Sequence, residues 1–194
     1  MNTKNLSRSP DLMTPEDTVL LVVDVQEKLL PLIPGARRIT WNLRRLLDGA
    51  AAVGLKALAT EQYPQGLGST VPELAGRLGA IPSKATFSCG GCEPFVSQLV
   101  DLGASKVMVS GIEAHVCVQQ TVLDLLASGY RVYVPVDAVG SRYAIDFETG
   151  LKRMESAGAT LTTTESALFE WCQVSGTPTF KKISALVRET PPED

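Results

Sequence analysis

The sequence predicts an α/β fold with three αβα layers around a doubly wound, mainly parallel sheet of six strands. Apolar runs rich in β-branched residues, such as Thr18–Val23, are typical of strands that are buried on both faces. These runs alternate with helical patterns along the chain, as they do in Rossmann-like folds. The 194 residues, 44% of them hydrophobic, suit one core. We expect an N-terminal arm over 1–16 and a single domain over 17–194.

The first half of the chain supplies three strands and one long helix. The first strand spans 18–24 and ends in the carboxylate of Asp24. Apolar residues at helical spacing predict a helix over 36–53, and Gly54 is its stop signal. A second strand follows over 55–60, a loop over 61–68 and a short third strand near 81–85.

The second half continues the alternation with three further strands. The predicted elements are a helix over 93–102, a strand over 106–110, a helix over 115–128, a strand over 131–135, a helix over 143–157 and a strand over 159–163. A last helix is expected over 178–189. If the strand order is 3-2-1-4-5-6, the first and fourth strands are neighbours in the sheet.

Asp24 and Cys117 are expected to share one crevice, because that order makes their strands neighbours where it reverses. Cys117 follows the fourth strand and opens a helical pattern. Unpaired N–H groups and the macrodipole at a helix start favour the thiolate. The alternative is a small buried hydrophobic residue, a common role of free cysteine.

Charge and hydropathy exclude several classes of partner. A formal net charge of -3 and a pI near 5.3 provide no basic surface for nucleic acid. No apolar run approaches the ~20 residues that span a membrane, and the N-terminus does not resemble a signal peptide. We expect a cytoplasmic protein with reduced cysteines and no membrane partner.

Three separated motifs resemble those of the isochorismatase-like cysteine hydrolases. They are Leu21-Val22-Val23-Asp24-Val25-Gln26, Ser83-Lys84-Ala85-Thr86-Phe87-Ser88 and Gly111-Ile112-Glu113-Ala114-His115-Val116-Cys117-Val118. The resemblance extends over about 17–187. The stretch Thr60-Glu61-Gln62-Tyr63-Pro64 and the stretch Gly66–Leu74 are similar to the isochorismatase-domain-containing branch.

The resemblance implies a metal-independent Cys–Asp–Lys triad. Cys117 would attack the carbonyl carbon of a small amide or a related C–N or C–O substrate, and Asp24 would carry the proton. Lys84 would hold a positive charge beside both. The resemblance also implies a cis peptide between Ile112 and Glu113, with the backbone N–H groups of Glu113 and Cys117 forming an oxyanion hole.

His115, the only histidine, is a poor base for Cys117, because a spacing of two residues places helical side chains on different sides. We expect it to have a capping or pocket-lining role. Family members with nicotinamidase activity carry an Asp/His metal site, and one histidine argues against such a site here. We therefore expect neither a metal nor another cofactor. Cys117 also argues against the cysteine-free vinyl-ether cleavage of true isochorismatases.

Two other functions stay open. Cys89-Gly90-Gly91-Cys92 is a CxxC motif, which predicts loop cysteines, a thiol redox pair or half of a zinc site completed by Cys172 and His115. Alternatively, the chain is a catalytically silent member whose pocket binds a metabolite or a partner. Preferential labelling of Cys117 over Cys172 by iodoacetamide is expected for the hydrolase.

Neutral-polar and aromatic residues near the carboxyl edge predict a pocket for a small, partly apolar substrate. The lining candidates are Gln26, Gln62, Tyr63, Phe87, Glu113 and His115. Apolar residues also follow the last strand, and in helix 178–189 they are Phe180, Ile183, Leu186 and Val187. This helix docks on its own domain or on a second subunit. We expect a homo-oligomer.

Overall fold

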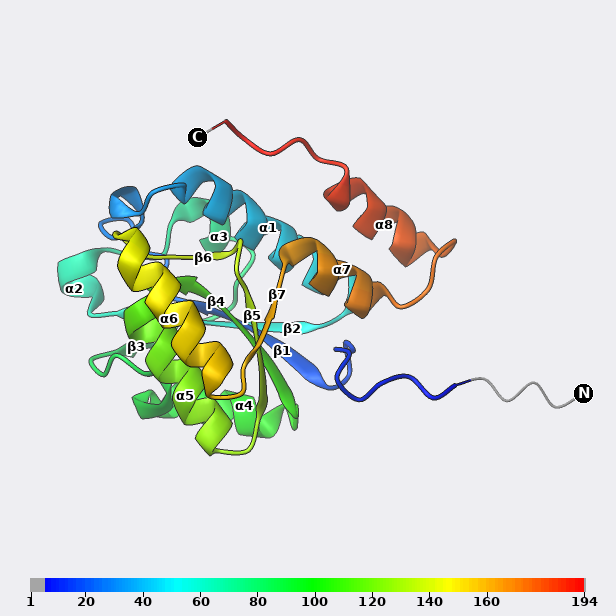
Figure 1. Cartoon of the computed structure of the whole chain (residues 1–194). Coiled ribbons are helices and arrows are strands. Elements are labelled where there is room, and N and C mark those ends of the chain that lie inside the picture. Colours follow the sequence, from blue (N-terminus) through cyan, green and yellow to red (C-terminus); the bar gives the residue numbers. More distant parts are fainter. Residues whose placement is uncertain (1–5, 194) are drawn as a thin grey trace, which may run out of the picture.

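A computed structural model describes residues 6–193, which form a seven-stranded parallel sheet between two layers of helices (Figure 1). The strands are β1 (Thr18–Val23), β2 (Lys56–Gln62), β3 (Ser83–Lys84), β4 (Lys106–Ile112), β5 (Arg131–Pro135), β6 (Val139–Gly140) and β7 (Thr160–Thr162). The order along the sheet is β3-β2-β1-β4-β5-β7. This order matches the arrangement that places the first and fourth strands side by side, with β7 as the sixth strand and the two-residue β6 added beside β4.

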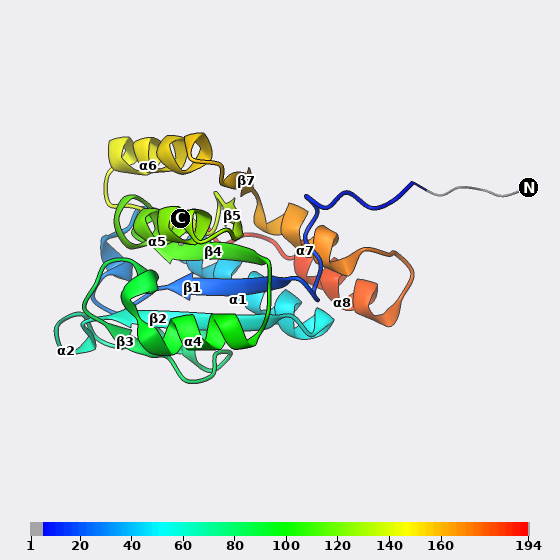
Figure 2. The same ribbon diagram turned by 90° about the horizontal axis from the view of Figure 1, so that it is seen from below.

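Helices cover both faces of the sheet. The longer ones are α1 (Ala36–Val53), α4 (Glu93–Asp101), α5 (Gln119–Ala127), α6 (Ala144–Ser156), α7 (Thr164–Cys172) and α8 (Pro178–Val187). Short turns of helix are η1 (Leu30–Leu32), α2 (Pro64–Leu67), α3 (Pro72–Ala75) and η2 (Cys89–Gly91). Helices α4, α5 and α6 cover one face, whereas α1, α7 and α8 cover the other (Figure 2). The doubly wound prediction is confirmed.

The two central strands bring the predicted site residues Asp24 and Cys117 to one edge of the sheet. All six residues of β1 and all seven of β4 are buried, as expected for strands covered on both faces. Val23, the last residue of β1, pairs with Thr60 on one side and Gly111 on the other. Gly111 has φ of 107°, and a Cβ there would lie 2.2 Å from the carbonyl oxygen of Val23. Only glycine fits at this position, because the ends of β1 and β4 approach each other closely.

Three sequence predictions need correction near the site and the C-terminus. Strand β2 extends through Gln62, so the first two residues of the predicted 61–68 loop are sheet residues, and α2 occupies most of the rest. The predicted helix 115–128 begins with a π-helical turn over 114–118, and α5 follows it. Helix α7 was not predicted, although Thr163 caps it by accepting the backbone N–H of Ser166.

The C-terminal helix docks on its own chain rather than projecting from it. Ile183 of α8 is fully buried, and Leu186 and Val187 pack beside the same core against α1. The N-terminal arm also packs closely: Met13 is fully buried, and Arg8 donates a hydrogen bond to the carbonyl oxygen of Glu170. Residues 1–5 of the predicted arm lie outside the described residues. No helix within residues 6–193 has the length and apolar character to cross a membrane.

Candidate active site

Asp24 lies where β1 ends, at the edge where the sheet order reverses. Its φ of 52° is left-handed, a conformation that aspartate tolerates better than most residues. The backbone N–H of Asp24 donates to the carbonyl oxygen of Thr60. Its side chain is fully buried, and each oxygen accepts a hydrogen bond: Thr60 Oγ1 donates to Oδ1 at 2.9 Å, and Lys84 Nζ donates to Oδ2 at 2.7 Å. The Cys117 thiol also interacts with this carboxylate.

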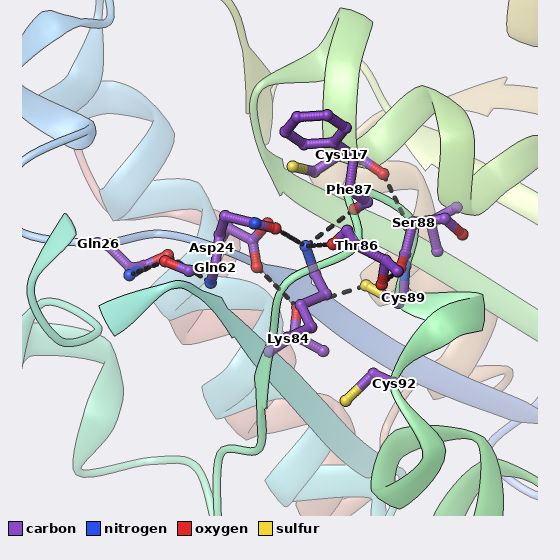
Figure 3. Close-up of polar contacts among 12 residues, drawn as sticks. Asp24, Gln26, Gln62, Lys84, Thr86, Phe87, Ser88, Cys89, Cys92 and Cys117 are labelled. Atoms are coloured by element: carbon purple, nitrogen blue, oxygen red, sulfur yellow. Dashed lines mark hydrogen bonds and ion pairs between the residues drawn. The ribbon is translucent and has the colours of Figure 1, made fainter. Parts of the chain in front are cut away.

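The ammonium group of Lys84 is completely surrounded by acceptors. Both it and the Asp24 carboxylate have side-chain exposures of 0%. Besides Asp24, Nζ contacts Gln62 Oε1 at 2.8 Å and the carbonyl oxygens of Thr86 and Phe87 at 3.2 and 2.9 Å (Figure 3). Fully buried lysines are rare, because an uncompensated buried charge costs several kcal/mol. Here the four acceptors compensate the charge of the ammonium group. A solvated surface lysine, its commonest role, is therefore excluded.

Cys117 lies in the π-helical turn immediately after β4. Its residue is 6% exposed, and its side chain faces the Asp24–Lys84 pair in Figure 3. The peptide between Ile112 and Glu113 is cis, as the family resemblance implies. The N–H groups of Val116 and Val118 both donate to the carbonyl oxygen of Glu113. The turn is held further by Thr121, whose hydroxyl donates to the carbonyl oxygen of Cys117 at 2.7 Å.

Burial dominates the electrostatics of this cluster. It raises the pKa of Asp24, although the Lys84 ammonium and hydrogen bonds from Cys117 and Thr60 oppose the rise. Burial and the neighbouring Asp24 carboxylate raise the pKa of the Cys117 thiol, with Lys84 opposing. The expectation that a helix start favours the thiolate is therefore wrong for the resting site. Cys117 rests as a thiol beside a carboxylate with raised proton affinity.

Two of the lining candidates serve the framework of the site. Gln26 is fully buried, and its amide bonds to both backbone groups of Gln62, at 2.8 and 2.9 Å. The Gln62 side chain orients Lys84 through Oε1, while its Nε2 donates to the carbonyl oxygen of Ala85. Gln26 thus joins the loop after β1 to the end of β2, and Gln62 extends the polar surroundings of the ammonium.

The remaining candidates have mixed positions. Tyr63 and Phe87 are 61% and 55% exposed, so their rings are accessible to a ligand. Glu113 is buried and accepts both the backbone N–H and Nε of Arg142 on Oε1. His115 is half-buried, and its Nδ1 lies 2.9 Å from Ser141 Oγ. His115 therefore braces the segment after β6, a contact that sequence spacing did not reveal.

The two cysteines of the CxxC motif are free and buried. Cys89 Sγ lies 3.4 Å from Thr60 Oγ1, and Cys92 Sγ lies 3.8 Å from the carbonyl oxygen of Ser83. Figure 3 shows both cysteines beside the Asp24–Lys84 pair. Burial raises the pKa of Cys89 to about 11, which disfavours a reactive thiolate. Among residues 6–193 no three His, Cys, Asp or Glu side chains form a cluster able to hold a metal ion.

The sequence profile described as "Isochorismatase domain" matches residues 18–166. Isochorismatase domain-containing protein 2A of Mus musculus is 38% identical over 182 residues, which are 92% of this chain and 86% of the mouse protein. Isochorismatase domain-containing protein 2 of Danio rerio is 37% identical, with 93% of this chain and 92% of the fish protein covered.

Solved structures agree with these sequence matches. A structure described as MAR1 ribonuclease from Caenorhabditis elegans superposes with a TM-score of 0.86 at 40% identity, covering 93% of this chain and 94% of that one. YcaC from Pseudomonas aeruginosa, solved with hexane-2,5-diol and covalent acrylamide, gives 0.85 at 26% identity, with 93% of each chain covered. The Escherichia coli YcaC product, described as an octameric hydrolase of unknown specificity, gives 0.86 at 25% identity and covers 93% and 91%.

Proposed function

This chain belongs to the isochorismatase family, and we propose that it is a metal-independent cysteine hydrolase in which Cys117, Asp24 and Lys84 form the catalytic triad. The observation that carries the proposal is the completely buried Asp24–Lys84 pair beside a buried thiol. A structural ion pair gains little over apolar packing in such a place. A proton acceptor held beside a nucleophile, in contrast, is what covalent catalysis requires.

The resting protonation state favours proton transfer during attack. Burial raises the pKa of both Cys117 and Asp24, so a neutral thiol faces a carboxylate that readily accepts a proton. As sulfur bonds to the substrate carbonyl carbon, the thiol proton moves to Asp24. Lys84 remains charged and stabilises the carboxylate before the transfer.

The second half of the reaction returns the proton. The tetrahedral intermediate collapses, the C–N or C–O bond breaks, and the leaving group takes the proton from Asp24. Water then attacks the thioester carbonyl while Asp24 accepts a proton from it. The second tetrahedral intermediate collapses with cleavage of the C–S bond, the carboxylic acid product leaves, and Asp24 returns the proton to the sulfur of Cys117. The backbone N–H groups of Glu113 and Cys117 are our candidates for binding the oxyanion. The hydrogen bonds of Val116 and Val118 to the Glu113 carbonyl hold this turn in place.

The substrate class that we propose is a small, uncharged or weakly polar amide or related ester. Lys84 is saturated by four acceptors and is not available to bind a substrate anion. The exposed rings of Tyr63 and Phe87 offer apolar contact at the edge of the site. The covalent acrylamide in Pseudomonas aeruginosa YcaC supports access of a small amide-bearing molecule to a nucleophile in a protein of this fold.

A substrate panel with matched variants tests this function. Wild type, Cys117→Ser and Cys172→Ser are assayed on small amides, esters and a phosphate ester. We expect amide or ester turnover that Cys117→Ser lowers by at least about a thousandfold, in line with the removal of a nucleophile. Cys172→Ser should retain full activity. Turnover of the phosphate ester alone, or an active Cys117→Ser protein, would contradict the mechanism.

Acrylamide gives a test that needs no known substrate. Because Cys117 is buried and its pKa is raised, a thiol reagent will label it before the more exposed Cys172 only if the pocket binds that reagent, and this condition applies to iodoacetamide as it does to acrylamide. Acrylamide carries an amide group that a small-amide pocket should bind, so its adduct should form first on Cys117. An adduct on Cys172 only, with Cys117 modified only after denaturation, would support the catalytically silent alternative.

RNA is a second candidate substrate, because the Caenorhabditis elegans protein at 40% identity is described as a ribonuclease. The net charge of -3 and the burial of Lys84 oppose it, since RNA binding depends on accessible cations. The discriminating assay is cleavage of a labelled RNA by highly purified wild type, Cys117→Ser and Asp24→Asn. RNA cleavage that Asp24→Asn abolishes would favour the ribonuclease over the amide hydrolase.

We also propose a cytoplasmic homo-oligomer. The octameric state of the Escherichia coli YcaC product supports assembly, although α8 of this chain docks on its own core. Tyr143 and Ile145 at the start of α6 are 63% and 70% exposed and are candidates for a subunit contact. Light scattering at micromolar concentration should show a mass above 20.7 kDa, and a monomer alone would exclude assembly.

A further inference from the structure

Thr60 touches the catalytic carboxylate but has no part in the triad. It ends a buried portion of β2, has an exposure of 0%, and pairs with Val23 across the sheet. Its hydroxyl donates to Asp24 Oδ1 at 2.9 Å, whereas Lys84 donates to Oδ2 at 2.7 Å. Two donors on different oxygens fix the plane of a carboxylate, whereas one donor leaves it free to turn about its terminal bond.

Cys89 extends this contact into a closed network. Its sulfur lies 3.4 Å from Thr60 Oγ1, and its backbone N–H donates to Thr121 Oγ1 at 2.9 Å. Thr121 in turn donates to the carbonyl oxygen of Cys117. Because Thr60 gives its only hydroxyl proton to Asp24, the Cys89 thiol must be the donor to Thr60. The network therefore connects the nucleophile turn to the catalytic carboxylate through buried groups.

We propose that Thr60, held by Cys89, is a positioning residue that orients the Asp24 carboxylate toward Cys117 and stabilises its charged form. This inference rests on the proposed function, in which Asp24 accepts the thiol proton. The ionisable groups that face Asp24 are Lys84 from β3, Cys117 from the π-helical turn and, through Thr60, Cys89 from η2. Thr60 also lowers the pKa of Asp24, against the larger effect of burial.

Thr60→Val tests whether Thr60 positions the Asp24 carboxylate, because valine keeps the shape of the side chain and removes the hydroxyl. Thr60→Ser keeps the hydroxyl. Thr164→Val is the matched control: Thr164 is equally buried, and its hydroxyl donates to Asp137 Oδ1 at 3.0 Å, outside the site. The readout is the rate of acrylamide addition to Cys117 between pH 5 and pH 9, measured by mass spectrometry on the full chain. Thermal unfolding verifies that each variant is folded.

We expect Thr60→Val to lower the rate by at least about tenfold, since hydrogen bonds to charged groups typically contribute more than the free energy of one decade. The acid limb of the pH profile should move upward by about one unit. Thr60→Ser should restore both, and Thr164→Val should change neither. A folded Thr60→Val protein with the wild-type rate and pH profile would overturn the inference.

A second readout separates this inference from the proposed function. Carbon-13 NMR titration of the Asp24 carboxyl reports its protonation whether or not Cys117 reacts. An Asp24 titration midpoint that is higher in Thr60→Val than in wild type, and normal again in Thr60→Ser, supports the inference. An Asp24 midpoint that is unchanged in Thr60→Val refutes it. A wild-type Cys117 that resists acrylamide, in contrast, counts against the hydrolase and leaves the NMR outcome to decide the role of Thr60.

Discussion

Replacing Lys84 by methionine removes the cation from a completely buried ion pair. The lysine ammonium lies 2.7 Å from Asp24 Oδ2, and neither side chain is exposed to solvent. Breaking such a pair typically costs about 3–5 kcal/mol, because it leaves an uncompensated buried charge. We expect that loss in the free energy of unfolding at pH 8. A chain of this size then melts roughly 6–20 °C lower.

The cost should depend on pH in a defined direction. Burial raises the pKa of Asp24 in the folded wild type despite Lys84, and removing Lys84 raises it further. A carboxyl whose pKa is higher in the folded than in the unfolded state loses stability as pH rises from its unfolded value toward its folded value. The difference between the folded and the unfolded pKa of Asp24 is larger in Lys84→Met than in wild type. The loss of stability in the variant, relative to wild type, should therefore grow from pH 5 to pH 8.

Lys106→Met is the matched control for this pH dependence. Lys106 Nζ also lies 2.7 Å from a carboxylate, that of Asp17, which is 32% exposed. Burial alone would raise the pKa of Asp17, but hydrogen bonds from Lys106, Thr18 and Thr14 lower it overall. Its contribution to stability is therefore lost only as pH falls through the acidic range. The deficit of Lys106→Met should be smaller, and nearly constant between pH 5 and pH 8.

Urea unfolding of wild type, Asp24→Asn, Lys84→Met and the double variant completes the assay. The double variant has no buried charge at the pair, so its loss should be smaller than the sum of the single losses by about 2 kcal/mol or more. Additivity within about 0.5 kcal/mol would show that the two side chains are not coupled. That result, or a deficit of Lys84→Met that shrinks as pH rises, would refute the reasoning.

Three further substitutions probe the frame around the site. Gln62→Leu removes one acceptor of the Lys84 ammonium, and we expect roughly tenfold slower acrylamide addition at Cys117 in a folded protein. Gly111→Ala should lower the free energy of unfolding in urea by roughly 3 kcal/mol or more, because Gly111 has a positive φ and a Cβ there would contact β1. The control Gly79→Ala, whose Cβ would lie in open space, should leave the free energy of unfolding unchanged. Met13→Ala should cost about 2–5 kcal/mol by the same measurement, since this residue of the arm is fully buried.

Hydrophobic periodicity was sufficient to predict most of the fold. Strand β1 and helix α1 carry strong patterns and lie within one residue of their predicted ends. Helix α7 was missed, because a Thr–Glu–Ser cap followed by a short apolar stretch resembles a loop that leads into the next helix. The π-helical turn before α5 has the same apolar spacing as an α-helix start, so no periodicity distinguishes the two.

By itself the sequence determined the alternation of strands and helices and hence a doubly wound parallel sheet. It brought Asp24 and Cys117 to one edge only under an assumed strand order, which the structure supplied. The resemblance added Lys84. Only the tertiary structure decided that the ammonium is fully enclosed, that the thiol rests protonated and that Thr60 holds the carboxylate. The physical reason is that a charge state depends on burial and on partners brought from distant strands, and a local sequence pattern specifies neither.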